Sequence, residues 1–207
     1  IVENTDEGIA SNEVEVMDSV TIRSIGDILI HDTVFQDADT GEGYSFDHMF
    51  DPVRPYLENA DITTANLEMI TAGSVFGPST YPFFNSPEEI IDALQNAGVD
   101  IVNNATNHSL DLGAEGAHAS IGALQERDMM YVGSFDSWDD YNTSRIIEVG
   151  DMSVGFLSYA NDANGNYIPE EEEYLLSLDG KAGVTYTLKK KNSILYKKII
   201  ILHYANS

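Results

Sequence analysis

The stretch VDIVNNATNHSLDLG, residues 99–113, decides the fold more than any other part of this sequence. Its apolar start predicts a buried strand over 100–103, and a helix is expected to begin after Gly113. An Asn-His pair directly after a buried strand can hold a divalent metal beside a phosphoryl group. The amide oxygen of Asn107 can ligate the metal, while His108 can donate a proton or a hydrogen bond to the reacting oxygen. Asn and His are also common in loops, so the prediction depends on further ligands at neighbouring strand ends.

The composition indicates one acidic domain without cysteine. The chain has 207 residues, of which 43% are hydrophobic, and this is enough for one sizeable core. The formal net charge of −25 argues against nucleic acid or an anionic membrane surface as a direct partner, and it is compatible with cation binding. Because cysteine is absent, any metal must be held by Asp, Glu, Asn and His. No apolar run approaches the roughly 20 residues that span a bilayer.

Apolar segments alternate with helix-like segments from residue 20 onward. The expected strands cover residues 20–25, 61–65 and 100–103, and the expected helices cover residues 48–59, 87–97 and 114–127. A Gly150-Asp151 turn then joins strands over 145–149 and 153–159 into a hairpin. This order predicts an α/β fold with a mostly parallel sheet and a later antiparallel portion.

Polar side chains follow three successive strands of the expected sheet. They are Asp27 after the first strand, Asn66 and Glu68 after the second, and Asn107 and His108 after the third. Any one of them is an ordinary turn or capping residue, but the carboxyl ends of parallel strands are where ligands bind. The set therefore predicts a shared polar site. Carboxylates combined with an amide and imidazoles suit manganese, iron or zinc.

Three of these segments resemble successive motifs of one known family. The segments SIGDILIHD (24–32), DITTANLE (61–68) and ATNHSLDLG (105–113) resemble the CapA family. These are capsule-synthesis proteins linked to poly-γ-glutamate, within the calcineurin-like metallophosphoesterase superfamily. YPFFNSP, residues 81–87, resembles the segment before the family's second helix. The match covers about residues 20–160 in order, which makes it more specific than any single motif.

The resemblance implies a sandwich of two mixed β-sheets flanked by helices, with a two-metal site at the strand ends. By position, Asp27 would ligate the first metal and Glu68 would take the place of the bridging carboxylate. Asn107 would ligate the second metal, and His108 would be the catalytic acid outside the metal shell. His203, in the segment IIILHY, resembles a ligand histidine at the end of a later family strand.

The chain departs from the superfamily pattern at two places. The usual Asp-x-His motif is replaced by Asp27-Ile28-Leu29, so its histidine is missing. His31 is either a substitute for it or an ordinary loop residue. The family also continues beyond the His203 position to further histidines, including a His-Pro-His segment, whereas this sequence stops at Ser207. The expected fold is therefore incomplete at the C-terminus, and the distal half of the metal site is expected to be absent.

The composition changes abruptly near residue 180. Residues 1–180 contain all 35 acidic residues and no lysine, whereas residues 181–207 contain all six lysines and no acidic residue. We divide the chain into a flexible acidic lead over 1–18, a metallophosphoesterase-like domain over 19–180, and a basic tail over 181–207. The tail is interpreted as a truncated or frame-shifted end of the same domain, with a basic segment that pairs with the acidic body as the alternative.

Two functions remain open. The first is a CapA-like role in the synthesis or export of poly-γ-glutamate capsule, with a metallophosphoesterase-type metal site. The second is an active metal-dependent phosphoesterase, in which a metal-bridging hydroxide attacks phosphorus. The expected partners are an anionic polymer or a phosphate ester, together with membrane-bound capsule synthase subunits, and not nucleic acid. The expected location is outside the cytoplasm, at the cell surface or anchored to the membrane through a missing N-terminal segment.

Overall fold

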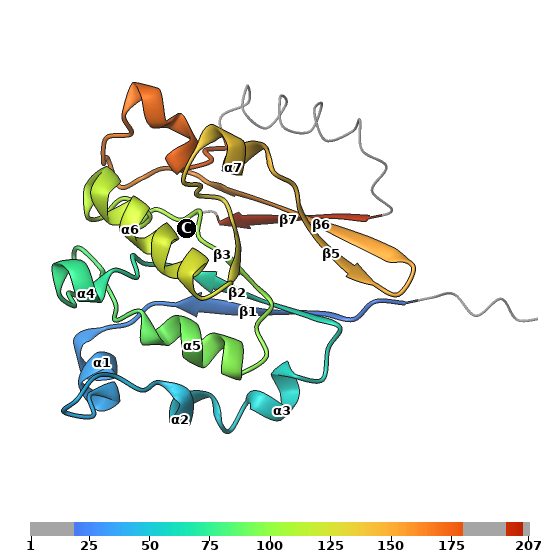
Figure 1. The fold of residues 1–207 in the computed structure, drawn as a ribbon, viewed down its shortest axis with the longest axis horizontal. Helices are drawn as coiled ribbons and strands as arrows, with labels where there is room; N and C mark the ends of the chain where they lie inside the picture. Colours follow the sequence, from blue (N-terminus) through green and yellow to red (C-terminus); the bar gives the residue numbers. More distant parts are fainter. Residues whose placement is uncertain (1–18, 180–197, 205–207) are drawn as a thin grey trace, which may run out of the picture.

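A computed structural model describes residues 19–179 and the backbone of residues 198–204, and it contains two β-sheets (Figure 1). The first sheet has the order β1-β2-β3-β4, and all its neighbouring strands are parallel. Its strands are β1 (Ile22–Ile28), β2 (Ile62–Leu67), β3 (Ile101–Asn103) and β4 (Met130–Val132). In the second sheet β5 (Arg145–Val149) and β6 (Met152–Ala160) form an antiparallel hairpin, and β7 (Lys198–Tyr204) runs parallel to β6.

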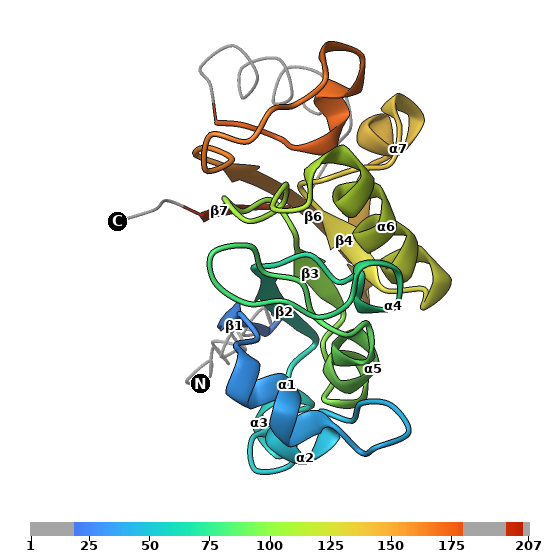
Figure 2. The ribbon, with the colours of Figure 1, turned by 90° about the vertical axis from the view of Figure 1, so that its left-hand side faces the viewer.

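Helices connect the strands of the first sheet, a further α-helix follows that sheet along the chain, and a 3₁₀ helix lies between β6 and β7 of the second. The α-helices are α1 (Asp32–Ala38), α2 (Asp47–Phe50), α3 (Arg54–Leu57), α4 (Gly73–Phe76), α5 (Glu89–Asn96), α6 (Gly113–Glu126) and α7 (Trp138–Asn142). A 3₁₀ helix, η1, covers Glu170–Leu175. Figure 2 shows α5 and α6 on one side of the first sheet and β7 on the other. None of the helices within the described ranges has the length and apolar character needed to cross a membrane.

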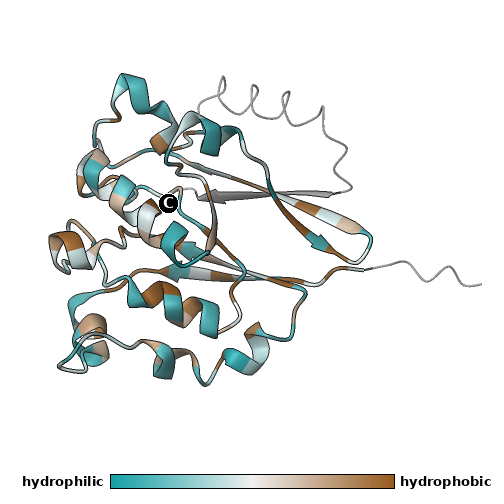
Figure 3. Cartoon of the chain, in the orientation of Figure 1, coloured by the Kyte–Doolittle hydropathy of each residue, from teal (hydrophilic) through white to brown (hydrophobic). Residues whose placement is uncertain are grey.

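The core lies between these layers. Five of the six residues of β2 are buried, which is expected for a parallel strand covered on both faces. Helix α5 buries Ile90, Ile91 and Leu94 almost completely, and Phe156 of β6 is 1% exposed. Each of these side chains contributes about 1.5–3 kcal/mol by leaving water. The outer surface is more polar: η1 begins with four hydrophilic glutamates and ends at Leu175, which is buried (Figure 3).

The expected fold class is confirmed. The chain is an α/β sandwich of two sheets with flanking helices, and the hairpin falls where the Gly150-Asp151 turn predicted it. The strand expected at 100–103 and the helix expected at 114–127 are also present, with small shifts at their ends. Within the described residues the first sheet is parallel throughout, and only the second is mixed. The lead over 1–18 and most of the tail over 181–207 lie outside the described residues.

Two local expectations were wrong. The helix expected over 48–59 is divided into α2 and α3, because Pro52 and Pro55 cannot donate backbone hydrogen bonds; Pro55 instead occupies the first turn of α3. Strand β1 does not stop at Gly26 but continues to Ile28 after a register shift between Ser24 and Asp27. That irregularity keeps Asp27 within the sheet, opposite Asn66 of β2.

Arg145 joins the hairpin to the first sheet. Its side chain is 10% exposed and forms an ion pair with Asp140. Its Nε donates to the carbonyl oxygen of Tyr131 at 2.8 Å, and its guanidinium carbon lies 5.0 and 5.1 Å from the ring centroids of Tyr131 and Phe135. The guanidinium thus satisfies polar groups of several segments at once, within a mostly apolar layer.

Asp140 is the anionic partner in this network. Its Oδ2 accepts a hydrogen bond from the Tyr131 hydroxyl at 2.6 Å and another from the Asp136 backbone at 3.0 Å. Burial alone would raise the pKa of Asp140, but these hydrogen bonds and Arg145 outweigh burial and hold the pKa below its usual value. The carboxylate is therefore better stabilised in the folded protein than in the unfolded chain.

Candidate functional site

Three adjacent strands bring polar residues to one edge of the first sheet. In the parallel register Asp27 of β1 lies opposite Asn66 of β2, and Asn66 lies opposite Asn103 of β3. These positions are at the carboxyl ends of their strands. The arrowheads of β1, β2 and β7 point to the same side of the molecule (Figure 1). Loops that follow the strands of both sheets can therefore meet at this edge.

A row of side-chain amides connects the two predicted carboxylate ligands. The Asn66 Nδ2 donates to Asp27 Oδ1 at 2.8 Å and to Glu68 Oε2 at 3.3 Å. Asn103 Nδ2 in turn donates to Asn66 Oδ1, and the Ser158 hydroxyl of β6 donates to Asn103 Oδ1. Glu68 is buried, whereas Asp27 is exposed at the mouth of the site. The sheet edge thus brings Asp27 and Glu68 to one shared donor.

The loop that carries Asn107 and His108 is held in place by its own polar residues and by the segment after β4. The Ser109 hydroxyl donates to the Asn104 carbonyl oxygen at 2.7 Å, and the Ser134 backbone donates to Asn104 Oδ1 at 2.9 Å. Gly133 has a φ of 121°, and a Cβ there would lie 2.3 Å from the Cβ of Ala105. Only glycine allows the segment after β4 to approach the loop so closely.

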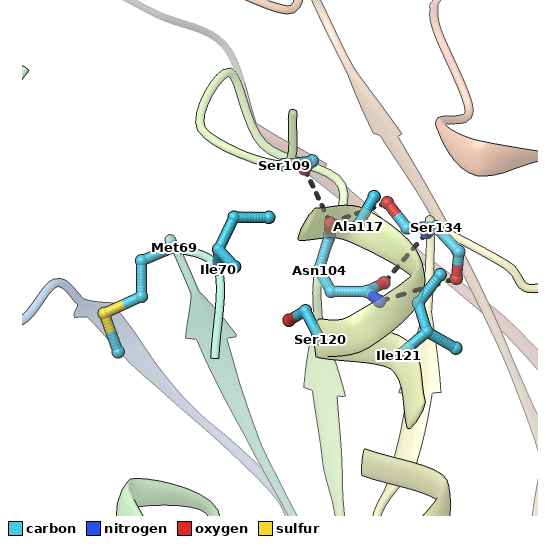
Figure 4. A pocket seen from close by; sticks show the side chains of 8 residues that line it. All are labelled: Met69, Ile70, Asn104, Ser109, Ala117, Ser120, Ile121 and Ser134. Atoms are coloured by element: carbon cyan, nitrogen blue, oxygen red, sulfur yellow. Dashed lines mark hydrogen bonds between the residues drawn. The ribbon is translucent and has the colours of Figure 1, made fainter. Parts of the chain in front are cut away.

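A small cavity lies under this loop. Asn104, Ser120 and Ser134 face it together with the apolar side chains of Met69 and Ile121 (Figure 4). Its space is about that of one water molecule, so it is a packing feature of the loop and too small for a substrate.

Asn107 has one satisfied and one unsatisfied side-chain atom. The residue is 8% exposed, and its Nδ2 donates to Asn164 Oδ1 at 3.1 Å. Its Oδ1 is buried without a hydrogen-bond partner. Leaving a buried acceptor unsatisfied costs about 1–3 kcal/mol, and so such an atom in a native fold calls for an explanation, such as an ion.

His108 is paired with a buried carboxylate. Its Nδ1 lies 2.8 Å from Asp111 Oδ2, and the Asp111 side chain is 1% exposed. The backbone of Phe84 donates to the same Asp111 oxygen at 2.8 Å. The hydrogen bond to Asp111 raises the pKa of His108 against the opposing effect of burial, and the charges of Asp111 and Glu68 raise it further. With Nδ1 held by Asp111, Nε2 is the nitrogen left to exchange a proton with a ligand.

Phe84 lies next to two histidine rings. Its ring centroid is 4.9 Å from that of His108 and 4.9 Å from that of His31, and both contacts are edge-to-face. His31 is exposed at the start of α1. It is therefore close to the candidate site, and its role as a substitute histidine stays a prediction.

The predicted site residues are brought together to different degrees. Asp27 and Glu68 share the Asn66 amide, and Glu68 is near enough to raise the pKa of His108. The backbone of His203 pairs with β6 opposite Tyr159, but its side chain lies outside the described residues. Among the residues that the structure describes, no group of three or more His, Asp and Glu side chains could hold a metal ion. A metal here would therefore depend on amide oxygen as well as carboxylate.

Several residues of this edge had no assigned role in the sequence analysis. They are Asn103, Asp111, Ser158 and Asn164. Asp111 was within reach of prediction, since it follows His108 by three residues in the motif itself. Asn164 precedes a glycine, which is typical of a turn, and nothing in the sequence connects it with Asn107, 57 positions earlier.

Several known proteins are similar in sequence to this chain. Capsule biosynthesis protein CapA of Bacillus anthracis is 26% identical over 160 residues, which cover 75% of this chain and 38% of CapA. Two uncharacterized proteins of Sinorhizobium fredii, y4sH and y4uA, are each 26% identical over 159 residues, covering 72% of this chain and 32% of their own length. The chain thus spans about a third of the length of these relatives.

A solved structure supports the fold. It is a Staphylococcus aureus protein assigned as a 5′-nucleotidase, crystallised with α-ketoglutarate, with a TM-score of 0.51 and 13% identity over 90% of this chain and 37% of that protein. This similarity agrees with the calcineurin-like metallophosphoesterase fold. Residues 21–199 match the family described as bacterial capsule synthesis protein PGA_cap. Since that match covers most of the sequence, this chain belongs to the PGA_cap family of bacterial capsule synthesis proteins.

Proposed function

We propose that this chain binds a divalent metal at the carboxyl edge of its first sheet and acts in the synthesis or export of poly-γ-glutamate capsule. One observation carries the metal proposal: the Asn107 Oδ1 is buried and has no hydrogen-bond partner. Asp27, Glu68 and Asn107 would hold the metal, with His203 as a predicted further ligand. Two carboxylates and an amide oxygen fit a hard or borderline cation such as manganese.

A divalent metal would offset the negative charge of the candidate site. Within the described residues, no lysine or arginine side chain forms an ion pair with Asp27 or Asp111. An anionic ligand would therefore meet repulsion from these carboxylates. A bound divalent cation would supply the positive charge that attracts and polarises a phosphoryl or carboxylate oxygen.

Replacing Glu68 by glutamine is expected to weaken manganese binding at least about tenfold. Loss of a residue that only hydrogen-bonds to a metal ligand already costs about tenfold in affinity, and loss of a charged ligand should cost no less. Glutamine keeps an acceptor for the Asn66 amide while it removes the charge. Isothermal titration of metal-stripped protein with manganese measures the affinity. Glu88→Gln is the matched control, because Glu88 is also a buried carboxylate but binds Ser74. Equal manganese affinity in wild type and Glu68→Gln would remove Glu68 from the site.

A second candidate function is hydrolysis of a phosphate ester, and the His108–Asp111 pair favours it. Asp111 holds Nδ1 and stabilises the imidazolium, so that Nε2 can donate a proton to a leaving oxygen. Turnover of p-nitrophenyl phosphate with manganese tests this role directly. Metal binding without any turnover would leave the chain as a binding component of capsule synthesis.

Replacing Asp111 by asparagine is expected to lower the pKa of His108, since the largest cause of its elevation is lost. An elevated pKa of a histidine adds stability below the unfolded pKa, and this stability is lost as pH rises through the folded pKa. Asp111→Asn should therefore destabilise the protein more at pH 5 than at pH 9. If His108 is the acid, turnover should also begin to fall at a lower pH than in wild type.

Proton NMR titration of the histidine ring signals, in chelated buffer, measures the pKa of His108. Asp136→Asn is the control, because it breaks a His-Asp pair of the same 2.8 Å length at His118. An unchanged His108 titration in Asp111→Asn would contradict the proposed pairing.

We further propose that the chain works outside the cytoplasm, beside membrane-bound capsule synthase subunits. The capsule family and the similarity to CapA support an association with capsule polymer machinery. With a net charge of −25, the surface would repel an anionic polymer, so contact with the polymer is expected to occur through the metal site.

A further inference from the structure

The loop that follows the second sheet's strand β6 reaches the Asn-His pair of the candidate site through Asn164. This residue lies in the loop that follows β6, and its φ is 53°. Its backbone N–H donates to Asp162 Oδ1 at 2.7 Å, and the Asn166 N–H donates to the Ala163 carbonyl at 2.8 Å. These bonds form a tight turn. The left-handed conformation at its centre is one that glycine and asparagine adopt readily.

The side chain of Asn164 contacts both residues of the Asn-His pair. Its Oδ1 accepts a hydrogen bond from Asn107 Nδ2 at 3.1 Å, and its Nδ2 lies 3.5 Å from His108 Nδ1. Asn107 is buried, whereas Asn164 is exposed. The turn therefore places one amide acceptor against the buried amide of Asn107.

The orientation of an asparagine amide is not determined by its own torsion. Its two ends are nearly equal in shape, and the terminal χ2 torsion is broad and roughly two-fold. For Asn107 the difference matters, since Oδ1 can ligate a cation and Nδ2 would repel it. In this structure Asn164 presents Oδ1 to Asn107, and this acceptor holds the Asn107 Nδ2 there and leaves Oδ1 on the other side.

We propose that Asn164 is a positioning residue: by accepting from Asn107 Nδ2, it turns the Asn107 Oδ1 toward a bound divalent cation. This inference rests on the proposed metal function. It also explains why the buried Oδ1 has no partner within the described residues. The Asn107 amide is committed to Asn164 at one end and is open for a ligand at the other.

Two substitutions of Asn164 and one control distinguish the role of its side-chain amide from that of its backbone conformation. Asn164→Gly keeps the left-handed conformation and removes the side-chain amide, with its acceptor for Asn107 and its contact to His108. It is expected to weaken manganese binding about tenfold, the lower end of the effect of losing an outer partner of a metal ligand. Asn164→Asp keeps an acceptor and should retain at least wild-type affinity. Asn166→Ala changes another asparagine of the same loop and should bind manganese as wild type does.

A double-mutant cycle with Asn107→Asp then tests the mechanism. A carboxylate at position 107 presents an oxygen in either orientation, so it needs no positioning. Asn164→Gly should therefore have almost no effect on manganese affinity in the Asn107→Asp background. Titration calorimetry of the full chain gives all four affinities, and circular dichroism confirms that each variant is folded.

The outcomes distinguish this inference from the proposed function. If wild type binds manganese and Asn164→Gly binds it equally well, the positioning role is wrong and the metal site stands. An equal loss in the wild-type and Asn107→Asp backgrounds also overturns it, because Asn164 would then act by another route. If wild type binds no manganese, the proposed function fails and this inference fails with it.

Discussion

Replacing Arg145 by methionine is expected to lower the free energy of unfolding by about 3 kcal/mol or more, because removal of one partner leaves a buried charge uncompensated. Asp140 would lose its cation, and the Tyr131 carbonyl would lose its Nε donor. Methionine retains much of the apolar stem, so the loss would report on the guanidinium itself. Urea unfolding followed by circular dichroism measures the change.

Arg127→Met is the matched control. Arg127 forms an ion pair with Asp92 at 3.0 Å, but the side chains are 24% and 48% exposed. An exposed pair of this kind contributes about 0–1 kcal/mol, since water screens it and long side chains lose entropy when they are held. Similar small losses in both variants would show that Arg145 does not anchor the hairpin.

The Arg145 network should also depend on pH in a defined direction. The pKa of Asp140 is lowered in the folded protein, so the network adds stability above the unfolded aspartate pKa. This stability is lost as pH falls through the folded pKa of Asp140. The difference between wild type and Asp140→Asn should therefore shrink in acid, and urea midpoints measured from pH 7 downward would show it.

The fold was predictable because its signals are local or follow from topology. The alternation of apolar runs and helical segments identified parallel strands. Parallel strands place the residues after them at one edge, and this predicted that Asp27 and Glu68 would lie together, as they do around Asn66. The order of the three motifs predicted the family, and the match over residues 21–199 confirms it.

The remaining features depend on contacts that no local pattern contains. The register shift that keeps Asp27 in β1 is decided by pairing with β2, whereas the sequence predicted a strand that ends at residue 25. Arg145 reads as a polar strand end, yet its partners Tyr131 and Asp140 bury it. The bond between Asn107 and Asn164 needs both sheets in place. Sequence could nominate Asn107, but it could not show which atom of its amide is free.

The effect of Asn107→Leu on the free energy of unfolding is expected to change sign when manganese is added. In metal-free buffer Asn107→Leu is expected to stabilise the protein by about 1 kcal/mol, because it removes a buried acceptor that otherwise remains unsatisfied. Asn164 is exposed, so water can replace the hydrogen bond that it loses. With manganese present, wild type gains the free energy of binding and the variant does not. At a concentration of 100 times Kd this gain is about 2.7 kcal/mol, so wild type becomes the more stable protein.

Urea unfolding of both proteins, with chelator and with manganese, measures the four free energies. Asn142→Leu serves as the control, because Asn142 is exposed on α7 and its amide donates to the Trp138 carbonyl within the same helix; its effect should not depend on manganese. A wild type that is more stable than Asn107→Leu in both buffers would mean that a group other than a metal satisfies Oδ1. The crossing of the two stabilities is specific to a binding site, because a residue retained only for packing or for the loop would favour wild type without metal as well. Asn107 is then best understood as a residue whose cost to folding is recovered only when a cation is bound.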